Sequence, residues 1–242
     1  MVWLTVKRRV FVLVLGLVAA AYSHSNSVEP KREYVQAEQA KHYAALLKEF
    51  GTNKVFAKGY ELQALTALSY FPRLKNINIE FIVRDEPVPM AARPTLLSLF
   101  KSAKHRVYQV ISDTQMDENR SALLLKNQPF NAQIGILGHE LAHIDHYLDR
   151  SFWGLLADAL CQFSNCRQDF EQENDLRLVA MGLGWQRYDH AVFVSENIKP
   201  EFVSPNTAEG SIYLTPESLL MAIKADAQYA KNIKNSIKNI SN

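Results

Sequence analysis

The amino-acid sequence predicts an α+β fold with a small mixed sheet and a helical majority. Apolar residues recur with helical periodicity in most segments, and most strongly over residues 131–150. The main strand patterns are limited to 77–83, where apolar and polar residues alternate, and to 106–112. We therefore expect few strands and many helices.

The composition excludes several classes of protein. Of the 242 residues, 48% are hydrophobic and 21% are charged, which argues against a disordered, collagenous or coiled-coil chain. A net charge of +2 is too small and too scattered to predict a nucleic-acid partner. The length suits one domain with appendages.

The N-terminus has the layout of a secretory signal. Lys7-Arg8-Arg9 precedes an apolar run over residues 10–21, and small residues lie at its exit. A bilayer span needs about 20 apolar residues, so the shorter run predicts a signal peptide over 1–23 and export to the periplasm or medium. The alternative is a retained membrane anchor.

The remaining elements follow from periodicity and from helix-breaking residues. Before the strongest helix we expect a helix over 34–50, a helix over 60–70, a strand over 77–83, a proline-rich connection over 87–94, a short helix over 95–100 and a strand over 106–112. After it we expect helices over 152–160 and 167–183, a strand over 190–195 and a helix that begins at Thr215-Pro216. We divide the chain into a signal peptide (1–23), an N-terminal helical segment (24–59), a main domain (60–200) and an amphipathic helical tail (201–242).

The tail and the cysteines each allow two interpretations. The lysine-flanked apolar residues of the tail predict a helix packed on the domain, or else one that binds a membrane surface or a partner. Cys161 and Cys166 are the only cysteines. In a continuous helix they would point to different faces, so a disulfide requires a break, which Ser164-Asn165 can provide. We favour the disulfide over two buried thiols because the compartment is expected to be oxidising.

His139-Glu140-Leu141-Ala142-His143 is an H-E-x-x-H motif on the strongest helix. At about 100° per residue, its apolar side chains form one stripe and the histidines lie on the opposite side. Gly135 and Ala142 flank that polar side, where we expect a cleft. Residues one turn apart can direct two imidazoles at one Zn²⁺, and Glu140 can take a proton from a water bound there.

A catalytic zinc site requires a third protein ligand. Glu171 and Asp175 lie one turn apart on the next predicted helix, so Glu171 can complete a His₂Glu set while Asp175 accepts an N–H from a ligand histidine. Glu173 is the rival ligand, but it has no acidic partner one turn further on. We therefore prefer Glu171.

These two motifs resemble those of the gluzincin metallopeptidases. Residues 168–175 are most similar to the second motif of the HtpX and CAAX-prenyl-protease-like group. The resemblance covers about residues 60–183 and implies a minimal zincin-like fold and a zinc endopeptidase, with Asp175 supporting His139. It also implies an edge strand that pairs with the substrate backbone, for which 106–112 is in the right place. The gap before Glu171 is shorter than is usual, and Asn174 replaces a small residue.

Two further histidines are candidates for secondary roles. His190, or Tyr188 beside it, can donate to the oxyanion of a tetrahedral intermediate, as His or Tyr does in relatives; the alternative is an ordinary loop residue. His146 shares the polar face of the motif helix, where a solvated side chain is the simpler expectation. Asp145 and Asp149 are expected to be surface charges, and Trp153 to be in the core or a cleft wall.

The sequence therefore predicts an exported zinc metalloendopeptidase that acts on peptides or proteins. One alternative is a metal-binding chaperone or adaptor without useful turnover. Another is a latent zymogen in which residues 24–55 or the tail cover the cleft. Peripheral membrane association is expected only through the tail or an uncleaved N-terminus.

Overall fold

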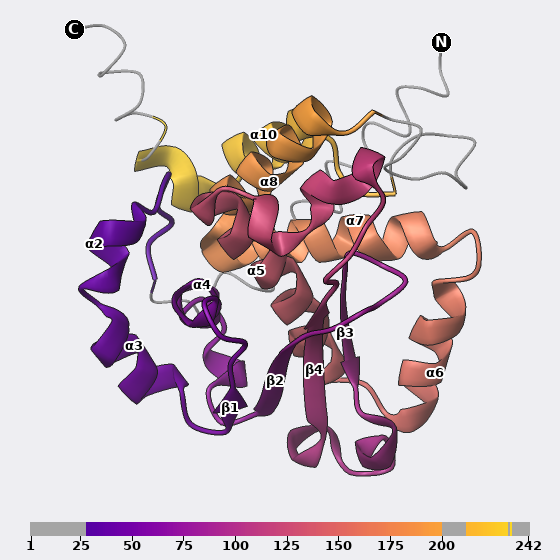
Figure 1. The fold of residues 1–242 in the computed structure, drawn as a ribbon. Coiled ribbons are helices and arrows are strands. Elements are labelled where there is room, and N and C mark those ends of the chain that lie inside the picture. Colours follow the sequence, from indigo (N-terminus) through magenta and orange to yellow (C-terminus); the bar gives the residue numbers. More distant parts are fainter. Residues whose placement is uncertain (1–27, 200–211, 232, 234–242) are drawn as a thin grey trace, which may run out of the picture.

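The computed structural model describes residues 28–199, 212–231 and 233, and within them the fold is α+β, as predicted (Figure 1). The predicted signal peptide and part of the predicted tail lie outside the described residues. The strands are β1 (Lys54–Val55), β2 (Asn78–Val83), β3 (Met90–Pro94) and β4 (Val107–Ser112). The α-helices are α2 (Gln36–Ala40), α3 (Tyr43–Phe50), α4 (Glu61–Leu68), α5 (Phe130–Tyr147), α6 (Phe152–Cys161), α7 (Arg167–Leu178), α8 (Gly184–Asn197) and α10 (Pro216–Ala225).

The four strands form one mixed sheet in the order β1-β2-β4-β3. The first three are parallel, and β3 runs antiparallel to β4. The strand predicted over 106–112 is therefore not an edge strand, because β4 has a neighbour on each side. The edge next to β4 is formed by β3, within the stretch predicted as a proline-rich connection, and β1 forms the other edge. Proline is tolerated at such an edge, where its missing N–H removes no ladder bond.

The core lies between the sheet and the helices α4 and α5. Ile79 and Phe81 of β2 and Tyr108 of β4 are at most 5% exposed and join the buried side chains of both helices. The N-terminal segment contributes to this core through Tyr34 and Phe50. Its strand β1 is too short to show the alternation on which strand prediction depends.

Several predicted boundaries change in the structure. The helix expected over 34–50 is divided into α2 and α3 by a turn, and the helix expected over 95–100 is only a 3₁₀ turn, η2 (Leu96–Ser98). The helix expected over 167–183 ends at Leu178 in a π-turn, within which Gly182 has a φ of 101°. This left-handed conformation suits glycine, and it turns the chain into α8.

The strand predicted over 190–195 is wrong, because α8 runs through all of these residues. Their short apolar run fits a strand or one face of a buried helix equally well. In contrast, the predicted helix start at Thr215 is confirmed: its side chain accepts a hydrogen bond from Ser218 N, and Pro216 follows. Leu219 and Ile223 of α10 are buried against α8, so the described part of the tail packs on the domain.

Candidate metal centre

The motif helix α5 buries its apolar stripe, as predicted, with Leu137 and Leu141 at most 2% exposed. Its polar side is also buried, because α7 and α8 pack across it. A Cβ atom on Gly135 would lie only 2.1 Å from the carbonyl oxygen of Gln186 in α8. The glycine therefore allows two helices to touch, and the cleft that we expected beside it is filled by α8.

Three ligand atoms converge from α5 and α7. His139 Nε2 and His143 Nε2 are 3.2 Å apart, and Glu171 Oε2 lies 3.1 Å from the first and 3.2 Å from the second. In a tetrahedral site with bonds of about 2.0–2.1 Å, neighbouring ligand atoms are about 3.3–3.4 Å apart. The buried His-His-Glu group can therefore hold one metal ion.

The hydrogen bond from His139 to Asp175 directs the other ring nitrogen, Nε2, toward the metal position. His139 Nδ1 lies 2.8 Å from Asp175 Oδ1, and a carboxylate only accepts, so Nδ1 carries the proton. His139 Nε2 faces His143 and Glu171, and a metal ion bound there would take the place of the proton on this nitrogen. Burial opposes a charge on His139, but Asp175 and Glu171 outweigh it and raise its pKa to about 9.

Asp175 is held by three donors in addition to its contact with His139. Arg187 of α8 donates from Nε to Oδ1 at 2.6 Å and from the guanidinium to Oδ2 at 3.2 Å, and Leu214 N donates to Oδ2 at 3.0 Å. Burial would raise the pKa of Asp175, but Arg187 and His139 lower it to about 2. Asp175 is therefore an anion that fixes the orientation of the His139 ring.

Glu171 is the third member of the group and Glu173 is not. Glu171 is 5% exposed, whereas Glu173 faces solvent. Burial would raise the pKa of Glu171, but His143 and His139 hold it well below its ordinary value. Gln162 Nε2 donates to the other oxygen, Glu171 Oε1, at 3.0 Å. Both oxygens of this carboxylate are therefore occupied, one by the histidines and one by Gln162.

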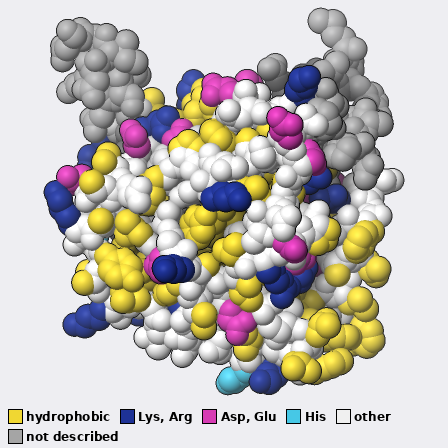
Figure 2. Space-filling model, in the orientation of Figure 1, with side chains coloured by type: hydrophobic (Ala, Val, Ile, Leu, Met, Phe, Trp, Pro, Cys, Tyr) yellow, Lys and Arg dark blue, Asp and Glu magenta, His cyan; other side chains and the backbone are white. Residues whose placement is uncertain are grey.

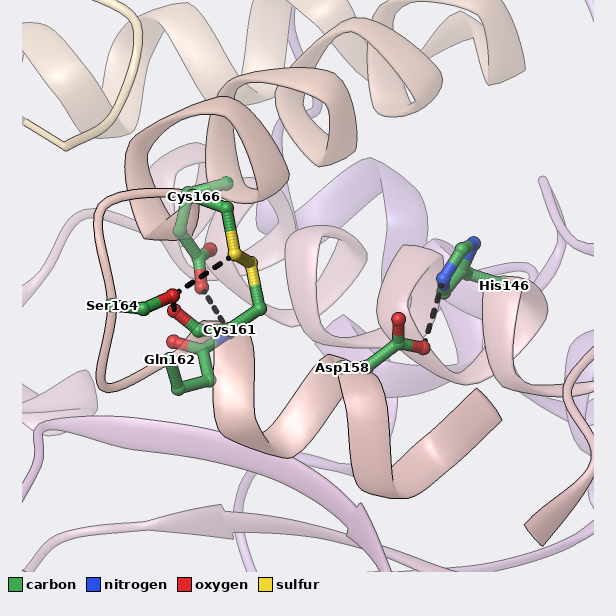
Figure 3. The surroundings of a disulfide bond; sticks show 7 residues. His146, Asp158, Cys161, Gln162, Ser164 and Cys166 are labelled. Atoms are coloured by element: carbon green, nitrogen blue, oxygen red, sulfur yellow. Dashed lines mark hydrogen bonds and ion pairs between the residues drawn. A yellow bond between two sulfur atoms is a disulfide. The ribbon is translucent and has the colours of Figure 1, made fainter. Parts of the chain in front are cut away.

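The connection between α6 and α7 positions this part of the site (Figure 3). Cys161, at the end of α6, is joined by a disulfide to Cys166, directly before α7. The predicted disulfide and the predicted break between the cysteines are both confirmed. The bridge closes the loop that carries Gln162, which lies nine residues before its hydrogen-bond partner Glu171.

Glu140 lies beside the ligand atoms on α5 and is 5% exposed. Burial raises the pKa of Glu140 above its ordinary value, although both motif histidines act in the opposite direction. A raised pKa brings a carboxylate closer to the range in which it can both accept and return a proton near neutral pH.

His190 is buried on α8, and its Nδ1 lies 2.8 Å from Gln128 Oε1. Burial and the charges of Arg187 and His139 hold the pKa of His190 well below its ordinary value. It is therefore a neutral histidine near the site, and its role as an oxyanion donor stays a prediction. Tyr188 instead packs against Trp185.

A segment of the C-terminal region lies against the site. The ring of Tyr213 meets His139 edge-on at 5.5 Å between centroids and lies 5.3 Å from the guanidinium of Arg187. The neighbouring Leu214 is tied to Asp175 by the backbone bond described above. This segment therefore covers the His139 side of the metal group.

The remaining polar residues of α5 differ from our expectation. Asp145 is fully buried and pairs with Arg73 at 3.1 Å, so it is not a surface charge; Asp149 pairs with the same arginine and is exposed. His146 is not simply solvated: it lies between Asp158 of α6 and Arg177 of α7. Periodicity placed His146 on the polar face, but it could not show that other helices would cover that face.

Sequence reasoning missed the residues that support the ligands. Arg187 and Gln162 act through contacts that depend on how α6, α7 and α8 meet, for which no spacing rule exists. Asn174 appeared only as a departure from the gluzincin pattern, yet its Nδ2 donates to His139 O at 2.9 Å and joins α7 to α5. In the sequence, only the position of Asn174 next to Asp175 indicates that it lies near the site.

Comparisons with protein-family models, with curated proteins and with solved structures give no significant match to this chain. Among the described residues, no helix is both long and apolar enough to cross a membrane.

Proposed function

We propose that this protein is an exported zinc-dependent endopeptidase of the gluzincin type, with a minimal zincin-like fold. The observation that carries the proposal is the convergence of His139 Nε2, His143 Nε2 and Glu171 Oε2 within 3.2 Å of one another. Asp175 behind His139 and Glu140 beside it supply the supporting anion and the base that such a site requires.

Zinc is the metal that suits two imidazoles and one carboxylate with room for a water. Bound there, it supplies a Lewis acid that lowers the pKa of water toward 7 and polarises a carbonyl group. Glu140 takes the proton of the attacking water and returns it to the amine that leaves. The raised pKa of Glu140 suits both transfers.

The edge strand β3 is the element that suits an extended peptide. Its only partner in the sheet is β4, and it packs against α5, which carries the motif. A peptide added to such an edge is held by main-chain hydrogen bonds. The proposed partner of the substrate backbone is therefore Met90–Pro94, in place of the segment over 106–112.

The test is zinc content and casein cleavage by the purified protein, with and without a chelator. Glu140→Gln should keep its zinc and lose about 100-fold or more in turnover, because the proton carrier is removed. Glu171→Ala should lose zinc, while Glu173→Ala on the same helix should keep it. Chelator-insensitive cleavage, or full activity of Glu140→Gln, would overturn the proposal. Zinc binding without any cleavage would favour the adaptor interpretation.

One observation favours latency as a second candidate. The three ligand residues are at most 5% exposed, and Tyr213 packs on His139. If this segment restrains the enzyme, Tyr213→Ala should cleave casein faster than the wild type, and Tyr213→Phe should not. Equal or lower activity of Tyr213→Ala would remove the latent interpretation.

A further inference from the structure

Among the described residues, half of the exposed large hydrophobic side chains, including the five most exposed, belong to two segments that lie side by side. We call the surface that they form the α6 surface and define it by residues of α6, of η2 and of the loops that follow each of them. Its members are Leu96, Leu97, Phe100, Trp153, Leu156, Leu160 and Phe163. Leu97 and Phe163 are 94% and 91% exposed. Figure 2 shows hydrophobic side chains gathered at the lower corner over these elements.

The two parts of the α6 surface are joined by direct contacts. The rings of Phe100 and Phe152 stack with their centroids 5.0 Å apart, and Phe152 meets Trp153 edge-on at 5.2 Å. Arg106 donates to the backbone oxygen of Arg150 at 2.9 Å, which fixes the loop before β4 to the start of α6. These contacts hold Phe100, which follows η2, against the start of α6, so the two apolar segments lie side by side.

Helix α6 inverts the usual arrangement of a surface helix. Its only charged residue, Asp158, is buried and contacts His146 at 3.2 Å (Figure 3). Asp158 also contacts Arg150 at 3.0 Å. Trp153, which we expected in the core or a cleft wall, is 73% exposed, and Leu160 is 62% exposed. Water is an unfavourable environment for such a face, so a contiguous patch of this kind marks an interaction site.

The charge beside the α6 surface indicates its partner. Lys101 and Lys104 are exposed in the loop that follows Phe100, and His105 follows them. The two segments that form the surface, 95–107 and 151–166, contain one acidic residue, the buried Asp158. Exposed aromatic and aliphatic side chains with adjacent lysines are the combination that binds the interface of an anionic bilayer.

We propose that the α6 surface docks on the surface of an anionic lipid bilayer. Trp153 and Phe163 enter the region of the headgroups and upper acyl chains, and Lys101 and Lys104 contact lipid phosphates. This docking is separate from any anchoring by the N-terminal apolar segment or the tail, and it does not depend on the proposed peptidase activity.

The experiment uses the full chain and the fluorescence of Trp153. The chain has three tryptophans, and Trp3→Phe leaves Trp153 with Trp185, which is 7% exposed. Phosphatidylglycerol vesicles with brominated acyl chains should quench the emission of Trp153 in this variant. The further change Trp153→Phe should remove the quenching. An unquenched Trp153 would overturn the proposal.

Matched variants separate this surface from other routes to the membrane. In the Trp3→Phe chain, Leu97→Asp with Phe163→Asp should abolish the quenching. The control is Val55→Asp with Met221→Asp, which adds the same charge at two apolar sites that are 61% and 59% exposed elsewhere. If the chain stays on vesicles through its N-terminus while only the first pair loses quenching, the proposal is supported. Equal effects of both pairs would overturn it.

The lysines provide a second test. Lys101→Gln with Lys104→Gln should weaken Trp153 quenching on phosphatidylglycerol by about 30-fold in lipid concentration, since each lysine contributes about 1 kcal/mol. Lys48→Gln with Lys58→Gln, also exposed, is the control. If Leu97→Asp with Phe163→Asp instead converts a dimer to a monomer in sedimentation without any lipid effect, a second copy is the partner and the proposal fails.

Discussion

Helices α6 and α7 are neighbours in the chain and are joined by a disulfide. Both depart from the usual pattern of a surface helix, which buries its apolar side chains and exposes its polar ones. Helix α7 buries its polar side chains Glu171, Asn174 and Asp175. Helix α6 buries Leu155 but exposes large apolar side chains on one face, with Trp153 and Leu160 at 73% and 62%.

The two helices differ in what offsets the unfavourable placement of these side chains. Every buried polar group named on α7 has a partner within the chain: Glu171 has the histidines and Gln162, Asn174 has His139 O, and Asp175 has Arg187. For the exposed side chains of α6, the compensation that we propose is a bilayer, outside the protein. Buried polarity that is fully paired indicates a preorganised site, whereas exposed apolarity indicates a surface for a partner.

Among the proposed variants, Asp175→Ala should cause the largest loss of stability. This change leaves the buried Arg187 without its carboxylate, and loss of one partner of a buried pair costs about 3–5 kcal/mol. Urea denaturation of the metal-free protein measures the free energy of unfolding. Asp169→Ala, exposed on the same helix, should change it by less than about 0.5 kcal/mol. A loss below about 1 kcal/mol in Asp175→Ala would contradict the pairing argument.

Removal of the disulfide between α6 and α7 should cause the next largest loss of stability. Cys161→Ser with Cys166→Ser should lower the free energy of unfolding by about 2 kcal/mol, because a short closed loop is released in the unfolded chain. A reducing agent should lower the stability of the wild type to the same level and leave the double variant unchanged. Equal stability of oxidised wild type and double variant would show that the bridge does not contribute.

The pH dependence of stability tests the charges that lie between α6 and α7. Burial and the charges of Arg177 and Arg150 lower the pKa of His146 to about 4, below the value of about 6.5 in the unfolded chain. The unfolded chain therefore binds more protons between these values, so this contribution is full above pH 6.5 and is lost as the pH falls to 4.

His146→Gln should reduce the slope of stability against pH in that window by up to about one proton. Urea denaturation at each pH, in the presence of a chelator, measures the slope. His105→Gln, an exposed histidine, serves as the control. The same slope in wild type and His146→Gln would mean that the pKa of this histidine does not change on folding, which would contradict the prediction.

The smallest effect is expected on the outer face of α6. Leu160→Ala should change the free energy of unfolding in water by less than about 0.5 kcal/mol, because its side chain is 62% exposed. Leu155→Ala on the same helix, at 7% exposed, should cost about 2–5 kcal/mol. Chemical denaturation of the two variants compares the faces directly. A large loss in Leu160→Ala would show that the face packs against the protein itself.

Some of the predictions from the sequence agree with the structure and others do not. The fold class, the motif helix, the helix start at Thr215 and the choice of Glu171 over Glu173 follow from local periodicity and spacing, and they agree with the structure. The edge strand and the strand over 190–195 were assigned wrongly. A five-residue edge strand that contains proline has little local signal, and a short apolar run does not distinguish a strand from a buried helix.

The sequence alone determined which residues can share one helix face, because that depends only on the fixed rotation per residue. This was enough to place His139 with His143 and Glu171 with Asp175. Only the tertiary structure decided that α8 covers the polar side of α5, that Arg187 and Gln162 support the ligands and that α6 turns its apolar face outward. These features depend on how helices pack across large sequence separations, and no local pattern encodes that geometry.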